Sequence, residues 1–194
     1  MVQINNWDKI PDAAEYDRPK PGGYIGVIVD YIDYSELDQN GKGMYLKLYW
    51  DFAEGPFTGS LNEANIRLGY WFGYGTFIRS YKEKALPFFK AFKTCLEVSN
   101  PRYVFRTDNL DAMTGKRIGI VLGEEEYRKK DGSVGTRLYV SEVRSVKAIQ
   151  EGDFKIPDLK RLNGQAATQT QSMPAWAPYS GGLPPLPDDV DIPF

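Results

Sequence analysis

The chain has 194 residues, of which 42% are hydrophobic and 14% aromatic, so it can form one domain of ordinary size with additional segments. It contains no histidine and one cysteine, Cys95, which excludes a Ser-His-Asp triad, a Cys-His nucleophile pair, the usual zinc ligand sets and an internal disulfide. The formal net charge is −2, no apolar run approaches the ~18 residues of a membrane span, and no secretory signal precedes Pro19, so we expect a cytoplasmic protein that needs no cofactor.

Residues 1–21 are predicted to form an extended N-terminal arm, because a tryptophan and several prolines are interspersed with acidic side chains. Residues 24–31 are rich in β-branched and aromatic side chains, which predicts a first strand. Gly26 inside this strand indicates a bulge or a sharp bend. The turn signal at residues 40–43 separates it from a second strand.

The second strand shows the clearest alternation of apolar and polar residues in the chain. One set of side chains is predicted to face the core: Met44, Leu46, Leu48, Trp50 and Phe52. The other set faces outward and contains Tyr45, Lys47, Tyr49 and Asp51. The pattern therefore predicts two outer tyrosines separated by a lysine.

A turn at residues 54–57 should lead into a third strand. Residues 68–78 follow, and they are too dense in aromatic residues and glycine for a regular helix. Trp71 and Tyr74 lie in this stretch with Arg79 just after it, and the pattern leaves open whether the two rings pack in the core or face solvent.

A single main helix is predicted next. Ser80 and Glu83 have the spacing of a capping box, and apolar side chains at helical spacing continue to about Val98. Pro87 should kink this helix or delay its start. Cys95 falls on the apolar side of the helix and is expected in the core rather than as a nucleophile.

Two strands, over residues 116–127 and 137–146, are predicted to form a hairpin around the turn at residues 130–133. Lys129, Lys130 and Arg137 gather near its tip. The hairpin also carries the most obvious candidates for a carboxylate metal site, namely Glu124, Glu125 and Glu126. Because adjacent strand residues point to opposite faces, the three should not converge on one ion, and we expect no metal site.

The composition changes at about residue 161. Residues 161–187 are predicted to be a disordered linker, because Gln, Thr, Ser, Gly, Ala and Pro dominate most of that stretch.

Charge is distributed unevenly along the chain. Residues 1–38 carry 3 basic and 8 acidic side chains, residues 39–161 carry 21 basic and 15 acidic side chains, and residues 162–194 carry no basic and 3 acidic side chains. The basic middle segment is compatible with a polyanionic partner despite the acidic total.

Residues 188–194 (DDVDIPF) combine three acids with apolar side chains and a final phenylalanine. An apolar anchor beside charge is typical of a peptide that a partner protein captures. The pattern is equally compatible with a solvated acidic tail that only aids solubility.

The predicted order of three strands, a helix and a two-stranded hairpin is that of an OB-fold, a five-stranded barrel that binds oligonucleotides. Residues 188–194 resemble the acidic C-terminal tip of bacterial and phage single-stranded DNA-binding proteins. Residues 22–160 resemble small phage proteins found with replication and recombination genes, through the runs at 96–101 (LEVSNP), 115–127 (GKRIGIVLGEEEY) and 149–155 (IQEGDFK). The arm is longer than in the simplest bacterial proteins, so their tetramer contacts cannot be carried over.

The resemblance implies an all-β protein with one main helix, organised as an arm (1–21), an OB-fold domain (22–160), a linker (161–187) and a partner-binding tip (188–194). It implies sequence-independent binding of single-stranded DNA in the cytoplasm of the cell or, for a phage protein, of its host. The residues expected to contact DNA are Tyr45, Lys47, Tyr49, Trp71, Tyr74, Arg79, Lys129, Lys130 and Arg137. Those expected to recruit replication or recombination proteins are Asp188, Asp189, Asp191, Ile192, Pro193 and Phe194.

Two other function classes stay open. One is an adaptor for replication or recombination that acts through protein contacts and binds DNA weakly or not at all. The other is a nuclease built on Asp and Glu, which the scattered acids do not favour, so we expect a binding protein and not an enzyme. A homo-oligomer is possible, and no membrane partner is expected.

Overall fold

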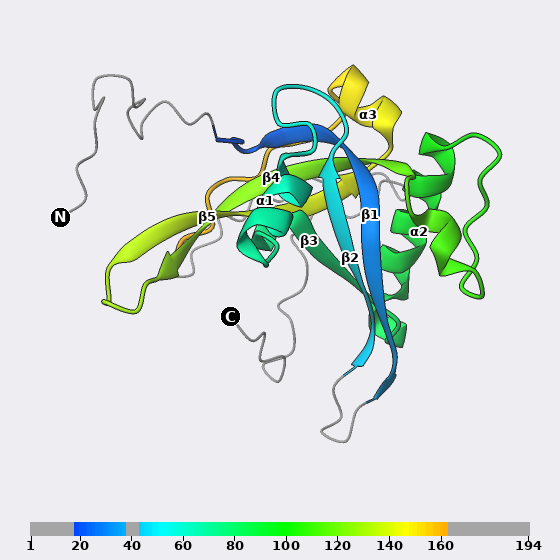
Figure 1. Cartoon of the computed structure of the whole chain (residues 1–194), viewed down its shortest axis with the longest axis horizontal. Coiled ribbons are helices and arrows are strands. Elements are labelled where there is room, and N and C mark those ends of the chain that lie inside the picture. The colour runs from blue at the N-terminus through cyan, green and yellow to red at the C-terminus, as the bar shows by residue number, and fades with distance from the viewer. Residues whose placement is uncertain (1–17, 38–42, 163–194) are drawn as a thin grey trace, which may run out of the picture.

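The computed structural model describes residues 18–37 and 43–162, so residues 1–17, residues 38–42 and the predicted tail at 163–194 lie outside the described part (Figure 1). Strands and helices follow in this order: β1 (Gly22–Leu37), β2 (Gly43–Phe52), α1 (Ser60–Leu68), η3 (Gly73–Gly75), β3 (Thr76–Ser80), η4 (Glu83–Ala85), α2 (Leu86–Ser99), η5 (Leu110–Met113), β4 (Arg117–Arg128), β5 (Val134–Arg144) and α3 (Val146–Glu151). None of the described helices is long and apolar enough to cross a membrane.

The five strands form one antiparallel sheet in the order β3-β2-β1-β4-β5. The prediction of a mostly β protein with one main helix is confirmed. The predicted closure into a barrel is not seen, because no pairing joins β3 to β5 among the described residues. The edge strand β5 nevertheless contacts the short η3 turn that leads into β3.

Four of the five apolar residues that the alternation of β2 assigned to the core are buried there, whereas Met44, near the start of the strand, is only half-buried. Leu46, Leu48 and Trp50 are fully buried, and Phe52 is 1% exposed. Strand β4 adds to the same cluster the fully buried residues at 118, 120 and 122. Each large apolar side chain removed from water contributes ~1.5–3 kcal/mol, so this cluster is the main source of stability.

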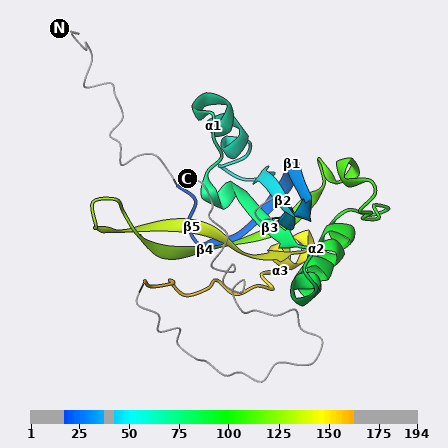
Figure 2. The ribbon, with the colours of Figure 1, turned by 90° about the horizontal axis from the view of Figure 1, so that it is seen from below.

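Helix α2 packs against β3, β4 and β5 (Figures 1 and 2). It buries Phe89, Phe92 and Leu96, whose spacing forms one helical stripe. The predicted capping box is wrong: Ser80 ends β3, and α2 begins at Leu86 without a side-chain cap. Pro87 occupies the first turn, where its missing N–H leaves no hydrogen bond unmade.

Helix α1 was not predicted, and a buried acid holds it in place. Asp51 is 2% exposed, although the alternation of β2 places it on the outer side. Its carboxylate accepts hydrogen bonds from the backbone N–H groups of Leu61 (3.1 Å) and Asn62 (2.9 Å), in the first turn of α1. The helix therefore covers this end of β2, with an acid at its N-terminus as the helix dipole favours.

The segment after β5 lies across the backs of β1 and β4. At Gly119 an added Cβ would lie 2.6 Å from Ile149, and at Gly23 it would overlap the ring of Phe154. Larger residues at these two positions would push the segment off the sheet. The sequence runs at 115–127 and 149–155 thus pack against each other.

Candidate nucleic-acid interface

The outer face of β2 carries Tyr45, Lys47 and Tyr49, all half-buried. The pairing register extends this face onto the neighbouring strands, because directly opposed residues in antiparallel strands point the same way. Tyr45 pairs with Tyr34 of β1, and Tyr49 pairs with Asp30. We call the surface formed by Tyr34, Tyr45, Lys47, Tyr49 and Trp71 the aromatic face.

Two ring pairs make up the aromatic face. The rings of Tyr34 and Tyr45 have centroids 4.7 Å apart, and those of Tyr49 and Trp71 are 5.4 Å apart. Lys47 lies between the two pairs along the strand, and its ammonium is 5.2 Å from the centre of the Tyr49 ring. Four residues of strand separate Tyr45 from Tyr49, or about 13 Å. The face therefore offers two aromatic sites with a cation between them.

Tyr34 was missed by the sequence analysis. It is 39% exposed and lies beyond residue 31, where the first strand was predicted to end. Strand β1 continues to Leu37, and its register shifts between Ile28 and Asp30. This irregularity breaks the period-2 pattern, so alternation alone does not assign Tyr34 to a face.

The charge on the aromatic face is mixed. The pKa of the Tyr49 phenol is raised, first by burial and then by the negative charge of Asp30. Tyr49 is therefore neutral at physiological pH and presents a ring with a hydroxyl group. Asp30 offsets part of the field of Lys47, so the face offers mainly rings rather than positive charge.

Trp71 and Tyr74 differ in position although both are half-buried against the core cluster. Trp71 reaches Tyr49 and belongs to the aromatic face. The ring of Tyr74 stacks on Phe72, with centroids 5.7 Å apart and planes 4° apart, and burial raises its pKa. The Tyr74 carbonyl accepts a hydrogen bond of 2.7 Å from the indole N–H of Trp50. Tyr74 thus anchors the η3 turn to the core.

Arg79 does not lie with Lys47. It is 7% exposed and points to the same side of β3 as Phe77, with its guanidinium 4.8 Å from that ring and 5.8 Å from the ring of Phe92. Burial lowers its pKa to about 10. The placement of Arg79 in the DNA-contacting set is therefore corrected: alternation along β3 turns it inward.

The predicted basic hairpin is present and projects from the sheet (Figures 1 and 2). Strand β4 pairs with β1 only over residues 117–122, whereas its pairing with β5 continues to Arg128. Residues 127–137, which we call the hairpin tip, contain four basic side chains and one acid. Lys129 and Lys130 are exposed there, and Arg137 forms an ion pair with Glu125 at 2.8 Å.

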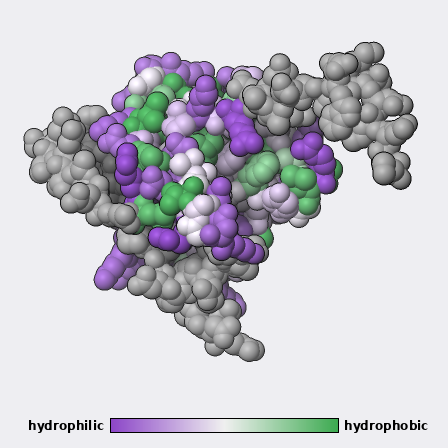
Figure 3. All heavy atoms as spheres, turned by 90° about the vertical axis from the view of Figure 1, so that its left-hand side faces the viewer, coloured by the Kyte–Doolittle hydropathy of each residue, from purple (hydrophilic) through white to green (hydrophobic). Residues whose placement is uncertain are grey.

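Hydrophobic and hydrophilic residues interleave on the side of the molecule towards which the hairpin projects (Figure 3).

The predicted DNA-contacting residues fall into two groups. The structure gathers Tyr45, Lys47, Tyr49 and Trp71 on one face and places Lys129, Lys130 and Arg137 on a separate projection. The predicted partner-binding residues at 188–194 lie outside the described residues.

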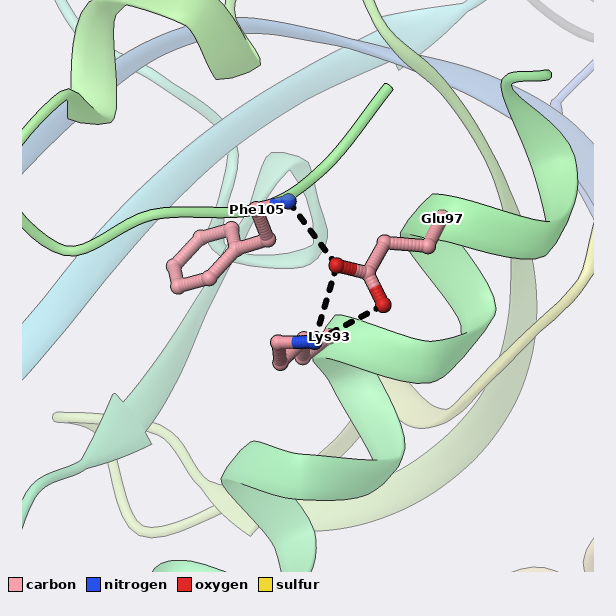
Figure 4. A network of polar contacts seen from close by, with 3 residues as sticks. All are labelled: Lys93, Glu97 and Phe105. Atoms are coloured by element: carbon pink, nitrogen blue, oxygen red, sulfur yellow. Dashed lines mark hydrogen bonds and ion pairs between the residues drawn. The ribbon is translucent and has the colours of Figure 1, made fainter. Parts of the chain in front are cut away.

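A shallow groove of about 1030 Å³ lies along α2, and an apolar floor that includes Leu86 and Phe105 lines it. Glu97 fixes one wall of this groove. Its carboxylate accepts hydrogen bonds from the Lys93 ammonium (2.8 Å) and from the Phe105 backbone N–H (2.9 Å), as Figure 4 shows. These bonds, the Lys93 bond first, lower the pKa of Glu97. The network holds the loop that follows α2.

Within residues 18–37 and 43–162 no group of three His, Cys, Asp or Glu side chains is arranged to hold a metal ion. Of the glutamates considered, Glu126 instead accepts a hydrogen bond from the backbone N–H of Leu162. Burial raises the pKa of the Cys95 thiol, which lies 3.6 Å from the Val143 carbonyl. A protonated, partly buried thiol is a poor nucleophile.

Comparison of the chain with protein-family models and with curated proteins gives no match.

Proposed function

We propose that this protein binds single-stranded DNA without sequence preference during replication and recombination, and that residues 188–194 recruit partner proteins. The observation that carries the proposal is the aromatic face, where two ring pairs flank Lys47 on the outer side of a sheet. Unpaired bases stack on such rings whatever their identity, because every base has a π-face.

An OB-type barrel is the fold that we propose. The strand order, the helix between β3 and β4, and the final hairpin support it. Contact between β5 and η3, next to the start of β3, supports it further. In such a barrel the second and third strands and the loops form the oligonucleotide site, which is where the aromatic face lies.

Binding would combine two kinds of contact. Stacking on the aromatic face contributes ~1–3 kcal/mol per base. Phosphate contacts at the hairpin tip, through Lys129, Lys130 and Arg137, would add a term that weakens as salt rises, because counterions are released on binding. The two contributions can be separated, since only the second should change the salt dependence.

A titration of the full chain with fluorescein-labelled oligo-dT, oligo-rU and duplex DNA tests the proposal. We expect a rise in anisotropy with oligo-dT, quenching of tryptophan fluorescence through Trp71, and weaker binding to duplex. Absence of binding to oligo-dT at about 50 mM salt, where phosphate contacts are strong, would refute it.

The alternative function is an adaptor that acts mainly through protein contacts. Asp30 beside Tyr49 favours it, since this carboxylate repels phosphates at the Tyr49 end of the aromatic face. An adaptor would show no gel shift with single strands, or one that salt does not change, and would still capture replication or recombination proteins through residues 188–194.

A further inference from the structure

Residues close to both ends of the described chain lie at one edge of β4. Gly22 of β1 pairs with Leu122, and Lys160 forms a bridge with Glu125. Because the other edge of β4 pairs with β5 at Glu125, both contacts use the edge that β5 leaves open. They lie three residues apart, or about 10 Å.

The register sets the direction from which the N-terminal arm arrives. Strand β1 runs antiparallel to β4, so lower residue numbers in β1 correspond to higher numbers in β4. The chain that precedes Gly22 therefore comes from the side of the hairpin tip. Tyr24 holds the residues just before β1 through two hydrogen bonds to Lys20. The Tyr24 hydroxyl donates one to the Lys20 carbonyl (2.8 Å) and accepts one from the Lys20 N–H (3.1 Å).

The arm and the hairpin tip have opposite charge. Residues 1–17 contain four acids and one lysine, and the hairpin tip contains four basic side chains and one acid. Asp12, Glu15 and Asp17 precede Gly22 by 10, 7 and 5 residues, and an extended chain spans at most ~3.3–3.6 Å per residue, so these acids can reach residues 127–132. Lys160 occupies the edge of β4 at Glu125, so the hairpin tip offers its basic side chains, not a free backbone edge, as a docking surface.

We propose that the acids of residues 1–17 dock on the hairpin tip and compete there with the phosphates of single-stranded DNA. This proposal on regulation rests on the proposed function. The arm fits this position better than the tail does. Asp17 directly precedes Arg18, whereas the first acid of the tail is Asp188, which is 26 residues after Leu162.

The docking itself can be tested without DNA. Zero-length carbodiimide cross-linking of the full chain, followed by peptide mass spectrometry, joins carboxylates to lysines that they touch. We expect links from Asp12, Glu15 or Asp17 to Lys129 or Lys130, and we expect oligo-dT to suppress them. Links to these lysines only from residues 188–191, or none at all, would overturn the docking.

The competition is tested with the triple variant Asp12→Asn, Glu15→Gln, Asp17→Asn. We expect its affinity for oligo-dT at about 50 mM salt to rise three- to tenfold. The slope of log K against log salt should steepen by about 2, because three more phosphate contacts would release counterions at ~0.7 each. An arm that serves only the fold would leave the slope unchanged, and that result would overturn the competition.

A matched control removes three exposed acids elsewhere, with Glu83→Gln, Asp108→Asn and Glu151→Gln. The control should change the affinity by less than twofold, and an equal gain would show a general charge effect and overturn the specific role of the arm. If neither protein binds oligo-dT, the proposed function fails, and the cross-links still decide whether the arm docks.

Discussion

Replacing Tyr49 with alanine removes one stacking ring from the aromatic face and leaves the fold in place. Tyr49 lies outside the buried core cluster, and its ring contacts are with Trp71 and Lys47. Stacking contributes ~1–3 kcal/mol per base, and Trp71 would remain to hold part of that contact. We therefore expect a loss of binding free energy in the lower half of this range, about 1.4 kcal/mol, which corresponds to a tenfold higher dissociation constant.

The assay is fluorescence anisotropy with labelled oligo-dT at one fixed salt concentration, with circular dichroism to check folding. Tyr103→Ala is a matched control. Tyr103 is half-buried, burial raises its pKa as it does that of Tyr49, and the Lys116 ammonium lies 5.2 Å from its ring centre. It lies outside the aromatic face, so the control should keep its affinity. An unchanged dissociation constant in Tyr49→Ala, or an equal loss in both variants, would refute the assignment.

The other predictions concern the hairpin, the tail and two buried charges. Lys129→Gln with Lys130→Gln should make the salt slope shallower by about 1.4, and an unchanged slope would remove the hairpin from the binding site. Deleting residues 188–194 should leave DNA affinity equal or higher but abolish pull-down of partner proteins, and the roles are reversed if DNA binding alone is lost. Arg79→Met should leave DNA affinity unchanged and the free energy of unfolding equal or higher. Burial lowers the pKa of Arg79 to about 10, so at any pH below 10 the folded protein holds a charge that burial disfavours. A weaker DNA complex would contradict this. Asp51→Ala should lower the free energy of unfolding by about 1–3 kcal/mol in urea titrations, since buried N–H groups lose their acceptor, and an unchanged midpoint would show that water replaces it.

Local pattern was sufficient for the middle of β2 and for the main helix. The period-2 alternation of β2 assigned Tyr45, Lys47 and Tyr49 to the outer face, and the structure places them there. Burial of Leu46 and Leu48 fixes the register, because a shift by one residue would exchange the two faces. The main helix was likewise predicted from the spacing of its apolar residues.

Local pattern failed where a contact between distant residues decides the structure. Helix α1 has a weak apolar side, with only Leu61 and Ala64 buried. The acceptor for the N–H groups of its first turn is Asp51, which belongs to another element, β2. Arg79 was assigned by its charge, because the third strand was predicted without bounds and its alternation, which puts Arg79 on the same side as Phe77, was not applied. No propensity marks a buried arginine, because its position depends on rings supplied by β3 and α2.

The runs that carry the resemblance to phage proteins have a structural role of their own. Gly119 lies in one run and Ile149 in the other, and the two residues are in direct contact. The packing of the segment after β5 on the sheet uses residues of two of the three runs, and none of the residues on the aromatic face lies in any of the runs. Sharing these runs with another protein therefore implies shared packing and does not by itself imply shared DNA binding. Tyr45, Tyr49 and the hairpin tip are where DNA binding has to be tested.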